Sequence, residues 1–524
     1  MVSKNDDDRR DYTPATLAVR VPRCMISAYS PREGAMRRHL FSVTVVLLLV
    51  GVGLAFTQQR LPAEAADDMV ARIRAEGLQR SRAMAMYRTL TDEIGARLTG
   101  SPAHKRAANW ARDRFAEFGL ANPHLEPYEF GRGWELEQMS VAMTEPRYFP
   151  LIAYAEAWTP STKGVITGRA VYVGDKSAAQ IQAMAGQLRG AIVLTSLPIA
   201  EWIERDRPQP GLDDKPVATG NPALPGARST TPANDLMPIL QRAGAAVALR
   251  PSAYRDGTVG VLGNRNTATD SVPSIIVAGE QYNILTRLAA SGHPPALRVE
   301  LRARSIEDDR NSYNVIADIP GGDPALRDQI VLVGAHLDSW HTASGATDNA
   351  DGAVAVLEAA RILEALGTAP RRTIRVALWS GEEQGLLGAR AYLMQHLNTP
   401  AARDQLDVYI NDDPGSGKTL GFYMEGNQAA KAIFDRWLTP LKDLGATRNV
   451  IEGIGATDHV PFNEMGLPGF NVIKDFDAYD VRTRHTNADF PERMSDDELR
   501  QSAIFMATFA WQAATANEKI PRGK

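Results

Sequence analysis

QIVLVGAHLDS at residues 329–339, followed by AVAVLEAARILEAL at residues 353–366, decides the fold of this chain. The first stretch is a short apolar run typical of a buried strand, and the second has apolar residues at helical spacing. The same unit recurs as TIRVALWSGEE at residues 373–383 and LLGARAYLMQHL at residues 386–397. Alternating strands and helices predict an α/β fold with a mixed, mostly parallel sheet and helices on both faces.

This alternation continues towards the C-terminus. Further strands are predicted in DVYINDDPG, residues 407–415, and in GFNVIK, residues 469–474. Helices are predicted near residues 429–441 and over residues 495–513. We therefore assign residues 306–516 to the main domain, whose ligand site should lie beyond the carboxyl ends of its strands.

The N-terminal half reads differently. Residues 66–135 are predicted as a helical part of the main domain, with one helix starting at Ser101 and closing at Gly119. Residues 136–305 contain short β-like runs such as RGAIVLTS, residues 189–196, and form a β-rich insert without a catalytic constellation. Within the insert, many Pro, Gly and Asp residues over 206–235 predict a long exposed loop.

Composition excludes several classes of protein. The chain has 524 residues, which predicts two folded units with flanking segments. A net charge of -4 gives no electrostatic footprint for nucleic acid, so none is expected as a partner. With Cys24 as the only cysteine, any metal must be held by His, Asp and Glu.

The N-terminal segment predicts export. Arg37 and Arg38 precede the apolar run FSVTVVLLLVGVGLAF at residues 41–56, the layout of a signal peptide over residues 36–57. The run is shorter than the ~20 residues of a spanning helix, although an uncleaved membrane anchor remains the alternative. Residues 1–35 are expected to be a non-native or disordered extension, with Met36 as the true start. We expect a secreted or periplasmic protein.

Metal-capable side chains stand where the predicted strands of the main domain end. They are His336, Asp338, Asp348, Glu382, Glu383, Asp412, Asp413 and His485. Several buried carboxylates at one sheet edge require cations to neutralise them. Two histidines and three carboxylates suit two zinc ions, which can share a carboxylate and activate a water. Of the adjacent Glu382 and Glu383, one would coordinate and its neighbour would act as general base.

These motifs also resemble a known family. The relevant stretches are GAHLDSW (334–340), GATDNADG (345–352), LWSGEEQGLLGARAY (378–392), DDPG (412–415) and HT (485–486). Together they resemble the M28 family of di-zinc exopeptidases. LTDEIGARLTGSP (90–102), LEPYEF (125–130) and WELEQMSVAMTEPR (134–147) are similar to its carboxypeptidase Q branch. That branch carries an inserted protease-associated domain, which would explain residues 136–305.

The resemblance implies a role for each metal ligand. His336 and Asp413 would hold one zinc, and Glu383 and His485 the other. Asp348 would bridge the two ions. In NDDPG, either aspartate could be the ligand, and the family pattern favours Asp413.

The resemblance also implies the remaining roles at the site. Asp338 would orient the His336 imidazole, and Glu382 would be the general base. The peptide bond from Asp348 to Asn349 is expected to be cis. The loop before His485 departs from the branch, because Val481 to Arg484 stand where histidines are common, so its substrate contacts are open.

The function implied is hydrolysis of dipeptides or short peptides at a free terminus, of the aminopeptidase or carboxypeptidase type. A glutaminyl-cyclase-like acyltransferase and a non-catalytic receptor-like ectodomain are the alternatives. The insert is expected to cover the cleft or to help form a homodimer. His104, His341, His459, Trp340 and Trp379 are interpreted as surface or structural residues.

Overall fold

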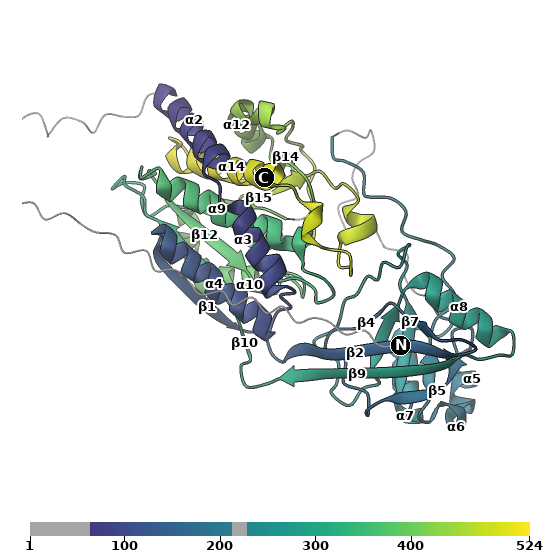
Figure 1. Cartoon of the computed structure of the whole chain (residues 1–524). Coiled ribbons are helices and arrows are strands. Elements are labelled where there is room, and N and C mark those ends of the chain that lie inside the picture. Colours follow the sequence, from purple (N-terminus) through teal and green to yellow (C-terminus); the bar gives the residue numbers. More distant parts are fainter. Residues whose placement is uncertain (1–62, 212–227, 414, 524) are drawn as a thin grey trace, which may run out of the picture. The chain divides into compact units, whose positions relative to one another are not determined.

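The computed structural model describes residues 63–211, 228–413 and 415–523, and Figure 1 shows its main sheet. The sheet has seven strands in the order β1-β10-β12-β11-β13-β15-β14. They are β1 (Ala121–Glu129), β10 (Asn311–Ile319), β11 (Ile330–His336), β12 (Thr373–Trp379), β13 (Leu406–Asn411), β14 (Thr419–Tyr423) and β15 (Gly469–Lys474). The four central strands β12, β11, β13 and β15 run parallel, and the outer pairings are antiparallel. The predicted mixed α/β sheet is confirmed.

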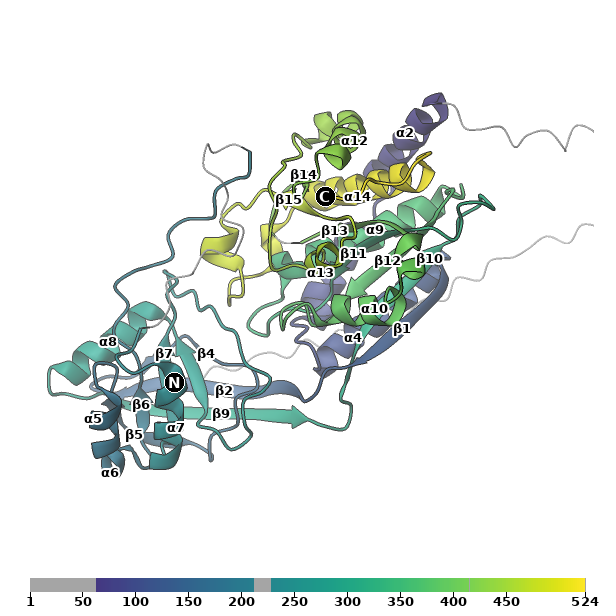
Figure 2. The ribbon, with the colours of Figure 1, turned by 180° about the vertical axis from the view of Figure 1, so that it is seen from behind.

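Helices cover both faces of this sheet. They are α2 (Ala63–Gln79), α3 (Ala83–Arg88), α4 (Pro102–Phe118), α9 (Asp351–Ala365), α10 (Leu387–His396), α11 (Pro400–Gln405), α12 (Gln428–Leu438), α13 (Val460–Glu464) and α14 (Asp496–Thr515). The largest core packs α9 and α14 against one face, whereas α10 and α13 pack on the opposite face, seen in Figure 2. Helix α9 is apolar almost all round because it is buried between the sheet and its neighbouring helices.

Residues 133–306 build a second sheet, of eight strands in the order β3-β2-β9-β5-β6-β7-β8-β4. The strands are β2 (Gly133–Glu145), β3 (Phe149–Pro150), β4 (Ala153–Ala155), β5 (Ile166–Tyr172), β6 (Ile192–Leu194), β7 (Val247–Pro251), β8 (Ser274–Val277) and β9 (Ala296–Ile306). Four helices accompany them: α5 (Ala178–Ala183), α6 (Ala185–Leu188), α7 (Ala233–Ala243) and α8 (Gly279–Ala290). The β-rich character predicted for the insert is confirmed, and the helices were not predicted.

Two edge strands of the main sheet escaped the sequence analysis. The prediction of a helical segment over residues 66–135 is correct for α2, α3 and α4 but wrong for β1. This strand reads ANPHLEPYE, and its two prolines hide the β pattern. Proline is tolerated on an edge strand, where half of the backbone N–H groups need no partner. Strands β10 and β14 were not predicted either, and the edge strand β14 is short and starts immediately after a glycine-rich turn.

The predicted start and end of α4 are confirmed. The Ser101 side chain accepts a hydrogen bond from the His104 backbone N–H, and Gly119 closes the helix with a φ of 95°. The His104 side chain is buried, and its Nε2 atom has no partner within the described ranges. Burial lowers the pKa of His104 from its usual 6.5 to about 4.

Because His104 is buried with a lowered pKa, we expect the protein to lose stability in acid. Between pH 6.5 and 4 the unfolded chain binds the proton and the folded chain does not, so the free energy of unfolding falls as pH falls. His104 should therefore lower the free energy of unfolding by about 2 kcal/mol at pH 5 relative to pH 7. Urea denaturation at both pH values should show a smaller difference for His104→Gln than for the wild type. The exposed His293→Gln is the control, and an unchanged difference in His104→Gln would contradict the prediction.

Several predictions fall on residues outside the description. They are the extension 1–35, the signal or anchor 36–57 and the central part of the loop 206–235. Within the described part of the chain, no helix is both long enough and apolar enough to cross a membrane.

Candidate metal centre

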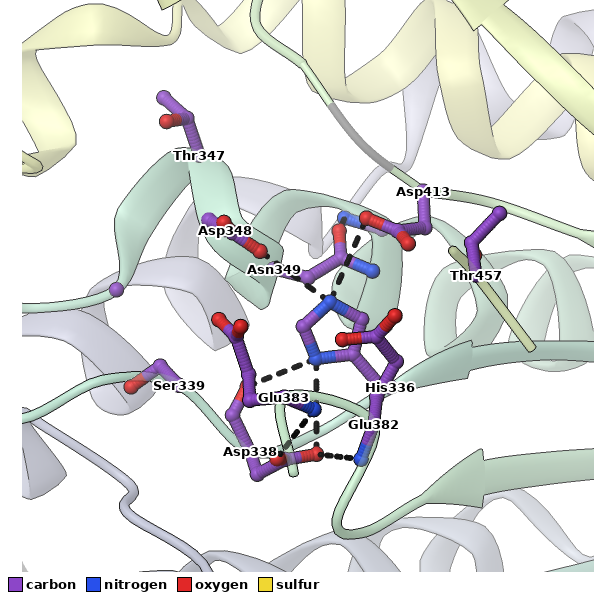
Figure 3. Close-up of polar contacts among 12 residues, drawn as sticks. His336, Asp338, Ser339, Thr347, Asp348, Asn349, Glu382, Glu383, Asp413 and Thr457 are labelled. Atoms are coloured by element: carbon purple, nitrogen blue, oxygen red, sulfur yellow. Dashed lines mark hydrogen bonds and ion pairs between the residues drawn. The ribbon is translucent and has the colours of Figure 1, made fainter. Parts of the chain in front are cut away.

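The carboxyl edge of the main sheet gathers all five predicted ligands. His336 is the last residue of β11, Glu383 follows β12 and Asp413 follows β13. Asp348 lies in the turn η2 (Ala346–Ala350) before α9, and His485 lies in the loop after β15. Figure 3 shows the side chains of His336, Asp348, Glu383 and Asp413 close together in this region. The parallel strands point the same way, so residues far apart in sequence meet at one edge.

The five side chains form two groups of three that share Asp348. In the first, His336 Nε2 lies 3.3 Å from Asp348 Oδ1 and 3.4 Å from Asp413 Oδ1. In the second, His485 Nε2 lies 3.2 Å from Asp348 Oδ2 and 3.0 Å from Glu383 Oε2. Asp348 thus directs one carboxylate oxygen to each group. The peptide bond between Asp348 and Asn349 is cis, as predicted.

The donor atoms of both groups fit a metal ion. His336 Nε2, Asp413 Oδ1 and Glu383 Oε1 are buried and have no hydrogen-bond partner among the described residues. Imidazole nitrogen and carboxylate oxygen are the donors that zinc takes in proteins without thiolates. Burial lowers the pKa of His485, but Glu383 and Asp348 outweigh it and raise the pKa to about 9. Metal binding would displace this proton, since only neutral imidazole coordinates.

Asp338 connects the end of β11 to the turn after β12. Its carboxylate lies 3.6 Å from His336 Nδ1, which is also 3.0 Å from the Asp338 backbone carbonyl. The same carboxylate accepts hydrogen bonds from the backbone N–H groups of Glu382 at 3.3 Å and Glu383 at 3.4 Å. Thr99 donates to it at 2.8 Å. One buried side chain therefore fixes the positions of the imidazole and both glutamates.

Glu382 lies beside the two groups but belongs to neither. Burial, together with the negative charges of Asp413, Glu383 and Asp458, raises the pKa of Glu382 well above its usual range, although His336 opposes the shift. The adjacent residues Asp412 and Asp413 have different partners. Asp413 faces His336, whereas Asp412 pairs with Lys474 at 3.0 Å.

Comparison with known proteins agrees with this arrangement. Residues 314–510 match the sequence model of peptidase family M28, and this range includes all five residues of the two groups. Carboxypeptidase Q from Mus musculus is 26% identical over 505 residues, covering 93% of this chain and 100% of the mouse protein. Residues 314–510 of the chain belong to peptidase family M28. The chain falls in the carboxypeptidase Q-like branch and is a zinc-dependent peptidase.

Two solved structures share the fold. A peptidase M28 precursor from Shewanella amazonensis is 22% identical with a TM-score of 0.66, covering 88% of this chain and 99% of that protein. A zinc aminopeptidase from Bacillus subtilis is 19% identical with a TM-score of 0.56, covering 83% of this chain and 95% of that protein. The likeness in fold to both proteins therefore extends over most of this chain.

Two contacts of the M28 site were missed by sequence reasoning. Trp340, interpreted as a core aromatic, is buried but also donates its Nε1–H to Glu383 Oε2 at 2.7 Å. Tyr479 donates its hydroxyl to Asp348 Oδ2 at 2.8 Å. Trp340 stands only two residues after Asp338, which is the one sequence signal for its role. Tyr479 begins the short helical turn η4 (Tyr479–Thr483), for which the sequence shows no pattern.

The remaining aromatic and histidine interpretations agree with the structure. Trp379 packs in the core and donates to the Tyr409 hydroxyl at 2.6 Å. His341 turns towards the insert, with Nε2 2.8 Å from the Ala155 carbonyl oxygen. His459 lies 3.0 Å from Glu425.

The insert of this M28 peptidase holds the loop that carries His485. Asp206 accepts hydrogen bonds from the backbone N–H groups of Ala478 at 2.7 Å and Asp480 at 2.8 Å. Arg207 forms a buried two-pronged ion pair with Asp480, at 2.8 and 2.5 Å. The prediction of an exposed loop is wrong for Arg207, because turn-rich composition does not reveal a buried partner far along the chain.

A second strip of the insert contacts the same loop. The Val261 backbone N–H donates to the His485 carbonyl at 2.9 Å, and the Tyr254 hydroxyl donates to the Arg484 carbonyl at 3.1 Å. His485 has a φ of 56°, in the left-handed region that non-glycine residues seldom adopt. Contacts on both sides of His485 therefore maintain a backbone conformation that would otherwise be unfavourable.

Proposed function

We propose that this M28 peptidase is a two-zinc exopeptidase that hydrolyses dipeptides or short peptides at a free terminus. The observation that carries the proposal is the shared Asp348, which gives one oxygen to each of two groups of ligands. Two metals bridged in this way commonly lie about 3.5–4 Å apart in hydrolytic enzymes.

In this proposal, His336 and Asp413 hold one zinc and Glu383 and His485 hold the other, with Asp348 between them. Bound zinc supplies Lewis acidity that polarises the scissile carbonyl and makes a water more acidic. Hydrogen bonds to the ligands fix their orientation, as such outer partners do in known zinc sites. The backbone carbonyl of Asp338 does this for His336, Trp340 for Glu383 and Tyr479 for Asp348.

Glu382 is proposed as the general base. Its carboxylate borders the cavity next to both groups and belongs to neither, so it is free to exchange protons. It would take a proton from the attacking water and deliver it to the amine that leaves. Asp338 holds the Glu382 backbone in place, which limits how far the carboxylate can drift between the two steps.

The cavity beside the proposed ligands has room for a small substrate. It has a volume of about 360 Å³, near the lower end of the ~300–1,000 Å³ found for small-molecule sites. Its lining includes Glu382, Asp413, Leu386, Ile454, Tyr479 and Arg484. A site of this size favours a dipeptide or the end of a short peptide over an internal stretch of a folded chain.

The alternative functions predict different metal contents. A cyclase-like transferase would hold a single zinc, and a receptor-like ectodomain would have lost ligands. The complete set of five ligands supports the peptidase. Export is also proposed, on the basis of the signal-like residues 36–57. The homodimer remains a prediction.

Metal analysis tests the proposal directly. Purified protein should contain about two zinc ions per chain, measured by mass spectrometry after gel filtration. A chelator should abolish dipeptide hydrolysis and added Zn²⁺ should restore it, because the ligands need the metal to activate water. About one zinc without peptide hydrolysis would favour the transferase, and a protein without zinc would favour the receptor.

A further inference from the structure

Arg484 is a buried cation at the metal centre that the proposed mechanism does not use. Arg484 is only 7% exposed, and its Nη1 atom is buried without a hydrogen-bond partner among the described residues. Within the described ranges, no carboxylate forms an ion pair with it and no side-chain hydrogen bond satisfies it. A buried guanidinium without an anion is costly, so this arrangement favours binding of an anion.

The wall of the cavity shows which anion could reach it. Arg484 lines the same cavity as Glu382 and four of the five proposed ligands, which are Asp348, Glu383, Asp413 and His485. Two other arginines line this cavity, and both are already engaged. Arg207 pairs with Asp480, and Arg390 pairs with Glu464 at 2.8 Å. Of the three arginines that line the cavity, Arg484 alone forms no ion pair with a carboxylate in the described ranges.

Hydrogen bonds hold both the backbone N–H and the backbone carbonyl of Arg484. Its N–H donates to the Tyr479 carbonyl at 2.9 Å, and its carbonyl accepts from the Tyr254 hydroxyl at 3.1 Å. The next residue in the chain is the proposed ligand His485. A charged group held in this way can position a substrate relative to the metals, with little entropy left to lose on binding.

We infer that Arg484 binds the α-carboxylate of the substrate and makes the enzyme selective for peptides with a free C-terminus. The inference rests on the proposed peptidase function and assigns its specificity to one side chain. A guanidinium presents two parallel N–H donors that match a carboxylate. In a dipeptide the carboxylate lies only a few bonds from the scissile carbonyl, so Arg484 beside His485 suits cleavage that releases the C-terminal residue.

Kinetics on matched substrates test this assignment. Ala-Leu and its C-terminal amide Ala-Leu-NH2 would be assayed with the zinc-loaded full-length wild type and with Arg484→Met. The wild type should favour the free acid by about 10- to 100-fold in kcat/KM, the usual effect of a charge-assisted hydrogen bond. Arg484→Met should reduce this ratio to near one by losing activity on the acid alone. Competitive inhibition by leucine, but not by leucinamide, should weaken in parallel.

Three further variants and substrates sharpen the result. Arg390→Met removes the same charge from the same cavity but from an arginine paired with Glu464, and it should keep the wild-type ratio. Arg484→Lys keeps the charge without the planar fork and should give an intermediate ratio. Zinc content should be unchanged in all variants. Ala-Asp-NH2 carries a carboxylate only in its side chain and should be a poor substrate.

The outcomes separate this inference from the proposed function. Equal rates of the wild type on Ala-Leu and Ala-Leu-NH2 would overturn the role of Arg484 while the peptidase stands. An unchanged ratio in Arg484→Met, or an equal loss on both substrates, would also overturn it. Fast, Arg484-dependent cleavage of Ala-Asp-NH2 would reassign Arg484 to an acidic side chain. A zinc-loaded wild type that cleaves no peptide would remove the proposed function and the inference together.

Discussion

Glu382→Gln is expected to lower kcat by about 10²- to 10⁴-fold while the protein keeps about two zinc ions per chain. The amide has nearly the shape of the carboxylate but cannot accept the proton of the attacking water. Because Glu382 belongs to neither group of ligands, its loss should leave metal binding intact. Steady-state kinetics on a dipeptide, with zinc measured on the same sample, provide the test.

The neighbouring residue supplies a matched control. Glu383→Gln makes the same chemical change one position along the chain, but Glu383 lies 3.0 Å from His485 Nε2 within the second group. This variant should lose zinc as well as activity. Wild-type turnover in Glu382→Gln would exclude Glu382 as the base, and zinc loss in that variant would make it a ligand instead.

Asp348→Ala should have the largest effect on metal content. Asp348 contacts both histidines through different oxygens, so its removal deprives both proposed metal sites of a ligand. Zinc content should fall well below one ion per chain, and activity should be lost with it. Dialysed protein would be analysed for zinc by mass spectrometry and for folding by circular dichroism.

Asp413→Ala provides the comparison for this experiment. Asp413 contacts only His336, so its removal should weaken one site and leave the other occupied. The expected order of zinc content is wild type, then Asp413→Ala, then Asp348→Ala. Full occupancy after Asp348→Ala would contradict the bridging role, and equal losses in the two variants would contradict the division into two groups.

The central part of the fold was accessible from sequence because its strands are buried on both faces. Such strands read as continuous apolar runs, as in residues 330–336. Edge strands lack this signal, and β1 carries two prolines that read as a loop. The helices of the insert were missed because they are short, apart from α7 and α8, and because strands dominate the pattern around them.

The positions of the proposed metal ligands could be predicted for a similar reason. His336, Glu383 and Asp413 each follow a recognisable strand, so the parallel order of the sheet predicts that they meet. Thr99, Tyr479 and Arg207 could not be found in this way. Each reaches the site from a loop or turn whose partner lies far along the chain, and no periodicity connects the two.

The contacts of Asp206 and Arg207 with Asp480 connect the insert to the loop that carries His485. In the proposed two-zinc enzyme, occupancy of the site that uses His485 and docking of the insert would be thermodynamically linked, and such linkage is reciprocal. Cation loading should tighten the docking, just as docking favours loading. Removal of residues 133–306 should therefore yield a protein that binds the second proposed zinc ion more weakly.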